Sequence, residues 1–147
     1  MSTETNKAIT RRFFEEIWNK GNLAVADDVL APNVVLRIPG QPEADIMGLA
    51  AYKERVITYL RAAFPDLQST IEEMVADGDK VVVRWTWRAT HRGEFWGVAP
   101  TGKQITYEGI SILRLADGKI VDDRFQADLL GLMQQFGAIP APAEDGA

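Results

Sequence analysis

The sequence predicts an α+β fold in which helices pack on one face of a strongly curved antiparallel sheet and enclose a central pocket. Three observations predict it. Apolar residues recur at helical spacing up to residue 64, whereas from residue 67 they alternate with polar residues. Tight-turn signals separate the later segments. Helices followed by a run of strands are typical of α+β proteins, and a curved sheet covered by helices leaves a cavity at its wide end.

Three helices are expected in the N-terminal half of the chain. The first carries Ile9, Phe13 and Ile17 at intervals of four residues, and a glycine supplies its C-terminal stop. The second fits residues 23–30, between an asparagine cap and a proline. The third runs from about residue 49 to residue 64, where the next residue, a proline, stops it.

Strands make up most of the remainder of the chain. The predicted strands are residues 33–38, 67–76, 81–91, 104–115 and 119–127. Asp-Gly pairs at residues 77–78 and 117–118 are signals for tight turns between neighbouring strands. A short closing helix is expected at residues 129–136. We therefore expect one domain over residues 1–137, followed by a flexible tail, residues 138–147, that is rich in Ala, Pro and Gly.

The composition excludes several classes of function. The 147 residues include 16 basic and 21 acidic side chains, and the formal net charge of −5 argues against nucleic acid or an anionic membrane as a partner. The absence of cysteine excludes disulfides, thiolate catalysis and thiolate metal sites. The polar N-terminus is no signal peptide and no apolar run reaches membrane-spanning length, so a soluble, cytoplasmic protein is expected.

Several familiar catalytic motifs are absent from the sequence. It has no Gly-rich phosphate loop, no G-x-S-x-G elbow and no H-E-x-x-H motif. A single histidine cannot build a multi-histidine metal centre, and no dense cluster of Asp and Asn suggests a site for a hard cation. We therefore expect no metal.

The inward row of the sheet is the strongest candidate for a site. Strand parity predicts a pocket walled by Trp85, Trp87, Tyr107 and Phe125, with Ser111, Asp123 and His91 as its polar members. Further substrate contacts are expected from Trp18 and Tyr52 on the helices and from Arg37, as an anion clamp, on the first strand. An aromatic box with few polar groups suits a flat, hydrophobic, oxygenated small molecule.

Six segments, in order along nearly the whole chain, carry a resemblance to a known family. They are N-K-A-I-T-R-R-F-F-E-E-I-W-N-K-G-N (6–22), L-R-A-A-F-P-D (60–66), G-D-K-V-V-V-R-W (78–85), T-H-R-G-E-F-W-G-V-A-P-T-G-K (90–103), D-G-K-I-V (117–121) and L-G-L-M-Q-Q-F-G (130–137). In these segments the chain resembles the SnoaL-like polyketide cyclases, also called ester cyclases, of the NTF2-like superfamily. The resemblance implies a conical α+β fold and a homodimer paired through the exposed face of the sheet.

The resemblance also implies an activity. Catalysis in this family needs no cofactor or metal: an acidic side chain moves protons during an intramolecular aldol ring closure of a polyketide ester. A carboxyl group in an apolar pocket has a raised pKa and can exchange protons near neutral pH.

The sequence departs from the family pattern at the catalytic position. Aligned without a gap, Phe125 stands where the aldol cyclases carry their catalytic aspartate, and Ser111 stands where they carry a pocket histidine. In many relatives an Asp-His pair occupies the positions of Leu36 and Arg37. We therefore expect Asp123, two residues before Phe125 on the same face, to be the proton-transfer group, aided by His91 or Tyr107.

Two alternatives remain open at this point. The first is epoxide opening in the same fold, with Asp123 and Arg37 as the acting groups. The second is a non-catalytic ligand-binding or assembly domain, which Phe125 favours because an apolar wall replaces the proton carrier. For single residues, a solvated surface Asp123 and a structural His91 are the competing interpretations. Two observations distinguish the catalytic from the non-catalytic interpretation: whether Asp123 points inward, and whether any other carboxyl group of the pocket has a pKa raised toward neutrality.

Overall fold

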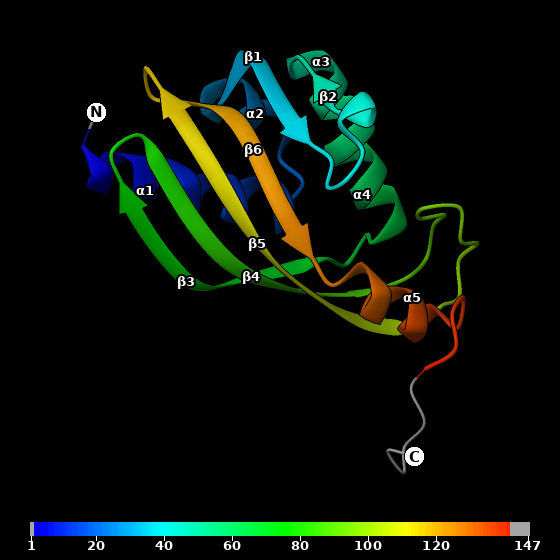
Figure 1. The fold of residues 1–147 in the computed structure, drawn as a ribbon. Coiled ribbons are helices and arrows are strands. Elements are labelled where there is room, and N and C mark those ends of the chain that lie inside the picture. The colour runs from blue at the N-terminus through cyan, green and yellow to red at the C-terminus, as the bar shows by residue number, and fades with distance from the viewer. Residues whose placement is uncertain (1, 142–147) are drawn as a thin grey trace.

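Six strands form one curved sheet that wraps around the N-terminal helices in the computed structural model, which describes residues 2–141 (Figure 1). The strand order is β2-β1-β6-β5-β4-β3. The strands are β1 (Leu30–Arg37), β2 (Ile46–Met47), β3 (Gln68–Asp77), β4 (Lys80–Thr90), β5 (Gln104–Ala116) and β6 (Lys119–Ala127). The architecture confirms the predicted α+β class. Of the predicted flexible tail, residues 142–147 lie outside the described residues.

The helices form the second layer. They are α1 (Thr3–Arg12), η1 (Phe13–Trp18), α2 (Leu23–Val29), η2 (Pro42–Ala44), α3 (Leu49–Tyr52), η3 (Lys53–Thr58), α4 (Tyr59–Ala63) and α5 (Leu129–Phe136). Two of the predicted helices contain a π-helical stretch: α1 continues into η1, and α3, η3 and α4 form one continuous helix. None of the helices within residues 2–141 is long and apolar enough to cross a membrane.

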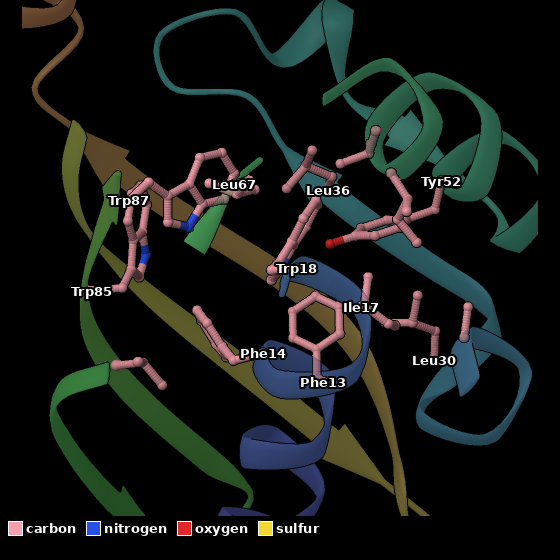
Figure 2. Close-up of a cluster of buried hydrophobic side chains, with 14 of the residues drawn as sticks. Phe13, Phe14, Ile17, Trp18, Leu30, Leu36, Tyr52, Leu67, Trp85 and Trp87 are labelled. Carbon is pink, nitrogen blue, oxygen red and sulfur yellow. The ribbon is translucent and has the colours of Figure 1, made fainter. Parts of the chain in front are cut away.

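The first helix supplies one side of the core. Its apolar stripe ends in Phe13, Phe14, Ile17 and Trp18, and all four side chains are buried. Figure 2 shows these side chains packed between the sheet and the helix that carries Tyr52. The π-helical turn of η1 continues the first helix through these residues, and Gly21 then ends the segment in the left-handed region at φ +65°.

The long strands follow the predicted alternation. In β5 every second residue is buried along the full strand, and its inward row pairs with the inward row of β4 through an uninterrupted antiparallel register. Register shifts occur between β3 and β4 and between β5 and β6, and such bulges bend a sheet. The sheet consequently curves, with the helices on its inner face (Figure 1).

Two features near β1 differ from the sequence prediction. The strand begins at Leu30 rather than Asn33, because the buried Leu30 pairs with Ile120 of β6. The predicted loop 39–48 contains η2 and the two-residue strand β2, which is too short to leave a periodic pattern. The pairing of β1 with β6 is parallel, whereas all other strand pairs in the sheet are antiparallel.

Candidate functional site

A cavity of about 370 Å³ lies between the helices and the inner face of the sheet. Its lining is dominated by aromatic and aliphatic side chains. The lining residues are Phe13, Phe14, Trp18, Leu36, Ile38, Ile46, Tyr52, Arg55, Val56, Tyr59, Leu60, Trp85, Trp87, Phe95, Trp96, Tyr107, Ser111, Asp123 and Phe125. A cavity of this size and composition suits a hydrophobic small molecule that is oriented by a few polar groups.

Asp123 is the one acidic residue of this lining, among the residues that the structure describes. It lies in β6 between Leu36 of β1 and Leu113 of β5, which are its partners in the neighbouring strands. Only 6% of its surface is exposed. The hydroxyl group of Tyr52 donates a hydrogen bond of 2.7 Å to its Oδ2 atom. Its Oδ1 atom takes part in no hydrogen bond within residues 2–141, so it is available to a ligand.

The surroundings of Asp123 shift its proton affinity. Burial raises the pKa of this carboxyl group from 3.8 to about 6; the nearby charge of Asp122 adds to this, and the hydrogen bond from Tyr52 opposes it. Burial raises the pKa of Tyr52 well above 10, so Tyr52 stays protonated and keeps donating. A carboxyl group with a pKa near 6 can both accept and return a proton close to neutral pH.

Tryptophans form the wall of the cavity on the sheet side. The rings of Trp85 and Trp87 lie 5.1 Å apart, and that of Trp18 from the first helix lies 5.2 Å from Trp87. The indole N–H of Trp85 donates to the hydroxyl oxygen of Ser111 at 2.9 Å, which fixes the ring. Burial raises the pKa of Tyr107 to about 12, so its hydroxyl group is also a permanent donor. The rings of Trp87 and Trp85 are tilted by 33° to each other, so each indole face offers its own flat surface to a ligand.

Arg37 does not line this cavity, although the sequence interpretation placed it on the substrate. Its cross-strand partner is Arg124, one residue beyond the inward Asp123, so it belongs to the opposite face of the sheet. There its guanidinium group pairs with Asp122 at 2.8 Å and with Asp45 at 3.4 Å. The pair of Asp123 and Arg37 that epoxide opening would use is therefore not formed.

His91 is buried but lies away from the cavity. It follows directly after Thr90, the last residue of β4, and its ring stacks against Phe136 of α5, with 4.0 Å between the centroids. Its Nδ1 atom accepts a hydrogen bond from the backbone N–H of Thr101. Desolvation lowers the pKa of His91, so the ring is neutral near pH 7. These contacts pack His91 against the closing helix, and its ring is not among the side chains that line the cavity with Asp123.

The structure thus brings eight of the ten candidate residues to one cavity. They are Trp18, Tyr52, Trp85, Trp87, Tyr107, Ser111, Asp123 and Phe125. Sequence reasoning missed Arg55 and Trp96, which also line it. Arg55 follows Tyr52 by three residues on one helix, which is a spacing that places two side chains on the same face. Trp96 stands before a glycine in a loop, where no periodic pattern marks it.

No metal site is formed by the part of the chain that the structure describes. Within residues 2–141, no group of three or more His, Asp or Glu side chains is arranged to hold an ion. The polar groups of the lining include the carboxyl group of Asp123, the hydroxyl groups of tyrosines and Ser111, the indole N–H groups and the guanidinium group of Arg55. This set can bind and orient an oxygenated molecule and can move a proton.

Comparison with known proteins gives similarity over most of the chain. The model of the SnoaL-like polyketide cyclase family matches residues 8–136. Aklanonic acid methyl ester cyclase DnrD from Streptomyces peucetius is 33% identical over 92 residues, which cover 61% of this chain and 62% of DnrD. The matched segment therefore spans about three fifths of the length of that curated relative.

Two solved structures are similar over nearly their whole length. A protein from Acidithiobacillus ferrooxidans, provisionally named a polyketide cyclase, is 38% identical with a TM-score of 0.80, over 94% of this chain and 99% of that one. A provisionally named SnoaL-like polyketide cyclase from Jannaschia sp. CCS1 is 26% identical with a TM-score of 0.84, over 94% and 95% of the two chains. The family model covers most of the chain and the fold is shared with these structures, so the chain belongs to the SnoaL-like polyketide cyclase family.

Proposed function

We propose that this protein catalyses the ring closure of a hydrophobic, polyketide-like ester by proton transfer, with Asp123 as the general acid and base. The observation that carries the proposal is the isolated carboxyl group of Asp123, buried in an aromatic cavity and held by Tyr52. An activated C–H group between two carbonyl groups is acidic enough to give its proton to a carboxylate that is relieved of water.

The reaction then runs in two proton transfers. The carboxylate of Asp123 removes the proton from the activated carbon, and the resulting enolate carbon attacks a second carbonyl carbon of the same molecule. A C–C bond forms, and the electron pair of the attacked carbonyl bond moves to its oxygen. Asp123 returns its proton to this oxygen, which becomes a hydroxyl group. The product is an isomer of the substrate, and Asp123 ends in its original state.

Other residues of the cavity support this chemistry. The hydroxyl group of Tyr52 fixes one carboxylate oxygen of Asp123 and leaves the other for the substrate. The indole rings of Trp85 and Trp87 offer flat surfaces on which conjugated rings stack. The proton carrier lies two residues from Phe125, the family's catalytic position, which corresponds to a displacement of about 7 Å along the strand. The substrate is therefore expected to bind with its reacting carbons displaced by this distance.

The test compares two neighbouring aspartates. Asp123→Asn keeps the shape and the hydrogen bond from Tyr52 but removes the base, so kcat should fall about 10²–10⁴-fold. Asp122→Asn is the matched control, because Asp122 pairs with Arg37 outside the cavity. This variant should keep the wild-type activity. Aklanonic acid methyl ester, named for the relative DnrD, is the first substrate, with the cyclised isomer followed by liquid chromatography.

The pH profile adds an independent measurement. Because the free enzyme must hold Asp123 as the carboxylate, kcat/KM should rise with pH through a midpoint near 6. Tyr52→Phe removes the hydrogen bond that lowers the pKa of Asp123, so this midpoint should move to higher pH. Full activity of Asp123→Asn would disprove the assignment of the proton carrier.

A non-catalytic ligand-binding domain is the second candidate, and Phe125 is the observation that favours it. Phe125 lines the cavity with an apolar ring at the family's catalytic position. Exchange of the activated C–H proton for deuterium in D₂O separates the two candidates, because it reports proton transfer even from a substrate that cannot close. Because these protons also exchange without protein, binding of a series of 1,3-dicarbonyl compounds with no exchange above the rate in buffer would support the binding domain.

A further inference from the structure

A tight turn at the cavity contains an unusual residue. Phe95 and Val98 exchange two backbone hydrogen bonds, of 3.1 Å and 2.9 Å, and the two residues between them both have positive φ angles, +50° at Trp96 and +80° at Gly97. This is the pattern of a type I′ turn, in which both central residues lie in the left-handed region. Asn, Asp and Gly are preferred there, and a bulky residue such as Trp is an outlier.

The same chain contains the ordinary version of this turn. Between β5 and β6, Asp117 and Gly118 have φ angles of +51° and +78°. In the residues that the structure describes, Trp96 and Asp117 are the only residues other than glycine with a positive φ. Asp117 belongs to the types that this conformation accepts, whereas Trp96 does not. The turn by itself would be more stable with Asn or Asp at position 96. A large aromatic ring at such a strained backbone position therefore indicates that the side chain has a function.

The surroundings hold the turn in place and leave the indole ring of Trp96 partly exposed. Phe95 is 2% exposed, with its ring 5.1 Å from Phe64 and 6.1 Å from Tyr59. The hydroxyl oxygen of Tyr59 accepts a hydrogen bond of 2.9 Å from the backbone N–H of Trp96, and the Tyr59 hydroxyl group donates to Glu94 at 3.0 Å. Trp96 itself remains 43% exposed while it lines the cavity. It therefore lies at the mouth, where the cavity meets solvent.

Arg55 supplies a positive charge to the same lining. Its side chain is exposed and lines the cavity from the helix that carries Tyr52 and Tyr59. Within residues 2–141 it makes neither a salt bridge nor a side-chain hydrogen bond, whereas Glu94, the carboxylate of the nearby turn, accepts hydrogen bonds from Tyr59 and Gly97. An arginine without a partner that lines the same cavity as an exposed indole ring is suited to a planar anion, since guanidinium pairs with carboxylates and aromatic rings stack.

We propose that Trp96 and Arg55 form a mouth subsite that binds the planar, anionic end of the ligand, the indole by stacking and the guanidinium group by pairing with a carboxylate or enolate. The inference deepens the proposed function and rests on it for the identity of the ligand. The subsite fixes the direction of binding: the neutral rings enter first and reach Asp123, while the anionic group stays at the solvent side. This arrangement also keeps the negative charge of the ligand away from the carboxylate of Asp123.

The test measures binding, so it does not depend on turnover. The probes are anthraquinone-2-carboxylate and its methyl ester, which share one planar ring system and differ in charge, and the measurement is isothermal titration calorimetry. The wild-type protein should bind the carboxylate about 5- to 10-fold more tightly than the ester. Arg55→Gln should remove this preference and leave the ester unaffected. Arg88→Gln, the same change on the exposed outer face of β4, should keep the preference.

The variant Trp96→Asn separates a role of Trp96 in ligand binding from a role in stabilising the turn. Asparagine is favoured in a type I′ turn, so the Tm should equal or exceed that of the wild type. The affinity for both probes should nevertheless fall about 10-fold, because the stacking surface is lost. A lower Tm with unchanged affinity would show that Trp96 only stabilises the turn and would overturn the proposal.

Further outcomes contradict the proposal directly. If Arg55→Gln and Arg88→Gln weakened the binding of the carboxylate probe equally, the effect would be one of overall charge and not of a subsite. A wild-type protein that binds neither probe would have no such subsite. The same titration on Asp123→Asn separates this proposal from the catalytic one. If that variant keeps both the charge preference and full turnover, the role of Asp123 fails while the mouth subsite stands.

Discussion

At the scale of single residues, Asp123 binds its proton under opposing influences. Burial in the aromatic cavity favours the neutral acid, whereas the hydrogen bond from Tyr52 favours the carboxylate. Asp122, the preceding residue, lies on the opposite face and is paired with Arg37. Successive side chains of a strand point to opposite faces, so one of these two adjacent carboxyl groups faces the cavity and the other forms an ion pair outside it.

The shifted pKa of Asp123 predicts a stability effect. A carboxyl group whose pKa rises from 3.8 in the unfolded chain to about 6 in the folded chain stabilises the fold fully below pH 4, and this contribution is lost as the pH rises through 6. The difference corresponds to roughly 3 kcal/mol at pH 8. Asp123→Asn should therefore increase the free energy of unfolding at pH 8 by up to this amount.

Urea denaturation at several pH values checks the prediction. The gain from Asp123→Asn should shrink steadily between pH 7 and pH 4, because the wild-type carboxyl group becomes neutral in that interval. Asp122→Asn should show no such gain, since it breaks the ion pair with Arg37. A destabilised Asp123→Asn variant at pH 8 would mean that the folded protein stabilises the carboxylate rather than the acid.

At the scale of secondary-structure elements, the packing of β4 against β5 shapes the cavity wall. Gly109 of β5 is the cross-strand partner of Trp85, whose indole ring lies across the glycine. A Cβ atom at Gly109 would lie 2.6 Å from the Cη2 atom of that ring and 2.8 Å from the carbonyl oxygen of Gln126. The glycine is therefore required for the close approach of the indole ring rather than for a turn.

Gly109→Ala tests this packing. The substitution should lower the free energy of unfolding by about 1–3 kcal/mol, as overpacking does, and should displace Trp85 from Ser111. Chemical denaturation gives the stability, and the emission of the tryptophans reports the displacement. In the double variant with Trp85→Phe, part of the loss should be recovered, because the smaller ring lacks the atoms that clash. A Gly109→Ala variant as stable as the wild type would contradict the packing argument.

At the scale of the whole molecule, the outer face of the sheet exposes large aliphatic side chains to solvent. Ile110 and Ile112 of β5 are 47% and 41% exposed on this face, in a strand that lies inside the sheet rather than at its edge. Large aliphatic side chains at such a place are typical of association surfaces. We propose that a second copy of the chain covers them, in line with the homodimer that the family resemblance implies.

Analytical ultracentrifugation tests the dimer. The wild-type protein should sediment at twice the monomer mass at micromolar concentration, and the double variant Ile110→Lys, Ile112→Lys should sediment as a monomer with an unchanged fold by circular dichroism. Val75→Lys, which replaces an exposed aliphatic residue of the edge strand β3, should leave the dimer intact. A monomeric wild-type protein, or dissociation by Val75→Lys alone, would refute an interface at this face.

By itself, the sequence determined the helices, the long strands and the rows of side chains that point inward. These follow from local periodicity, because a helix repeats every 3.6 residues and a strand every two. Asp123, Trp85 and Tyr107 could therefore be predicted to point inward without any knowledge of their neighbours. The segment around β2 could not, because two residues carry no period.

Only the tertiary structure decided which inward residues share the cavity. Asp123 and Tyr52 are 71 residues apart in the chain, and their hydrogen bond exists because β6 pairs with β1 beneath the helix of Tyr52. The parallel register of that pair turns Arg37 outward, and the segment after β4 places His91 against Phe136 rather than in the cavity. The physical reason is the same each time: local periodicity selects the face of an element, whereas long-range pairing and packing set its position along that face.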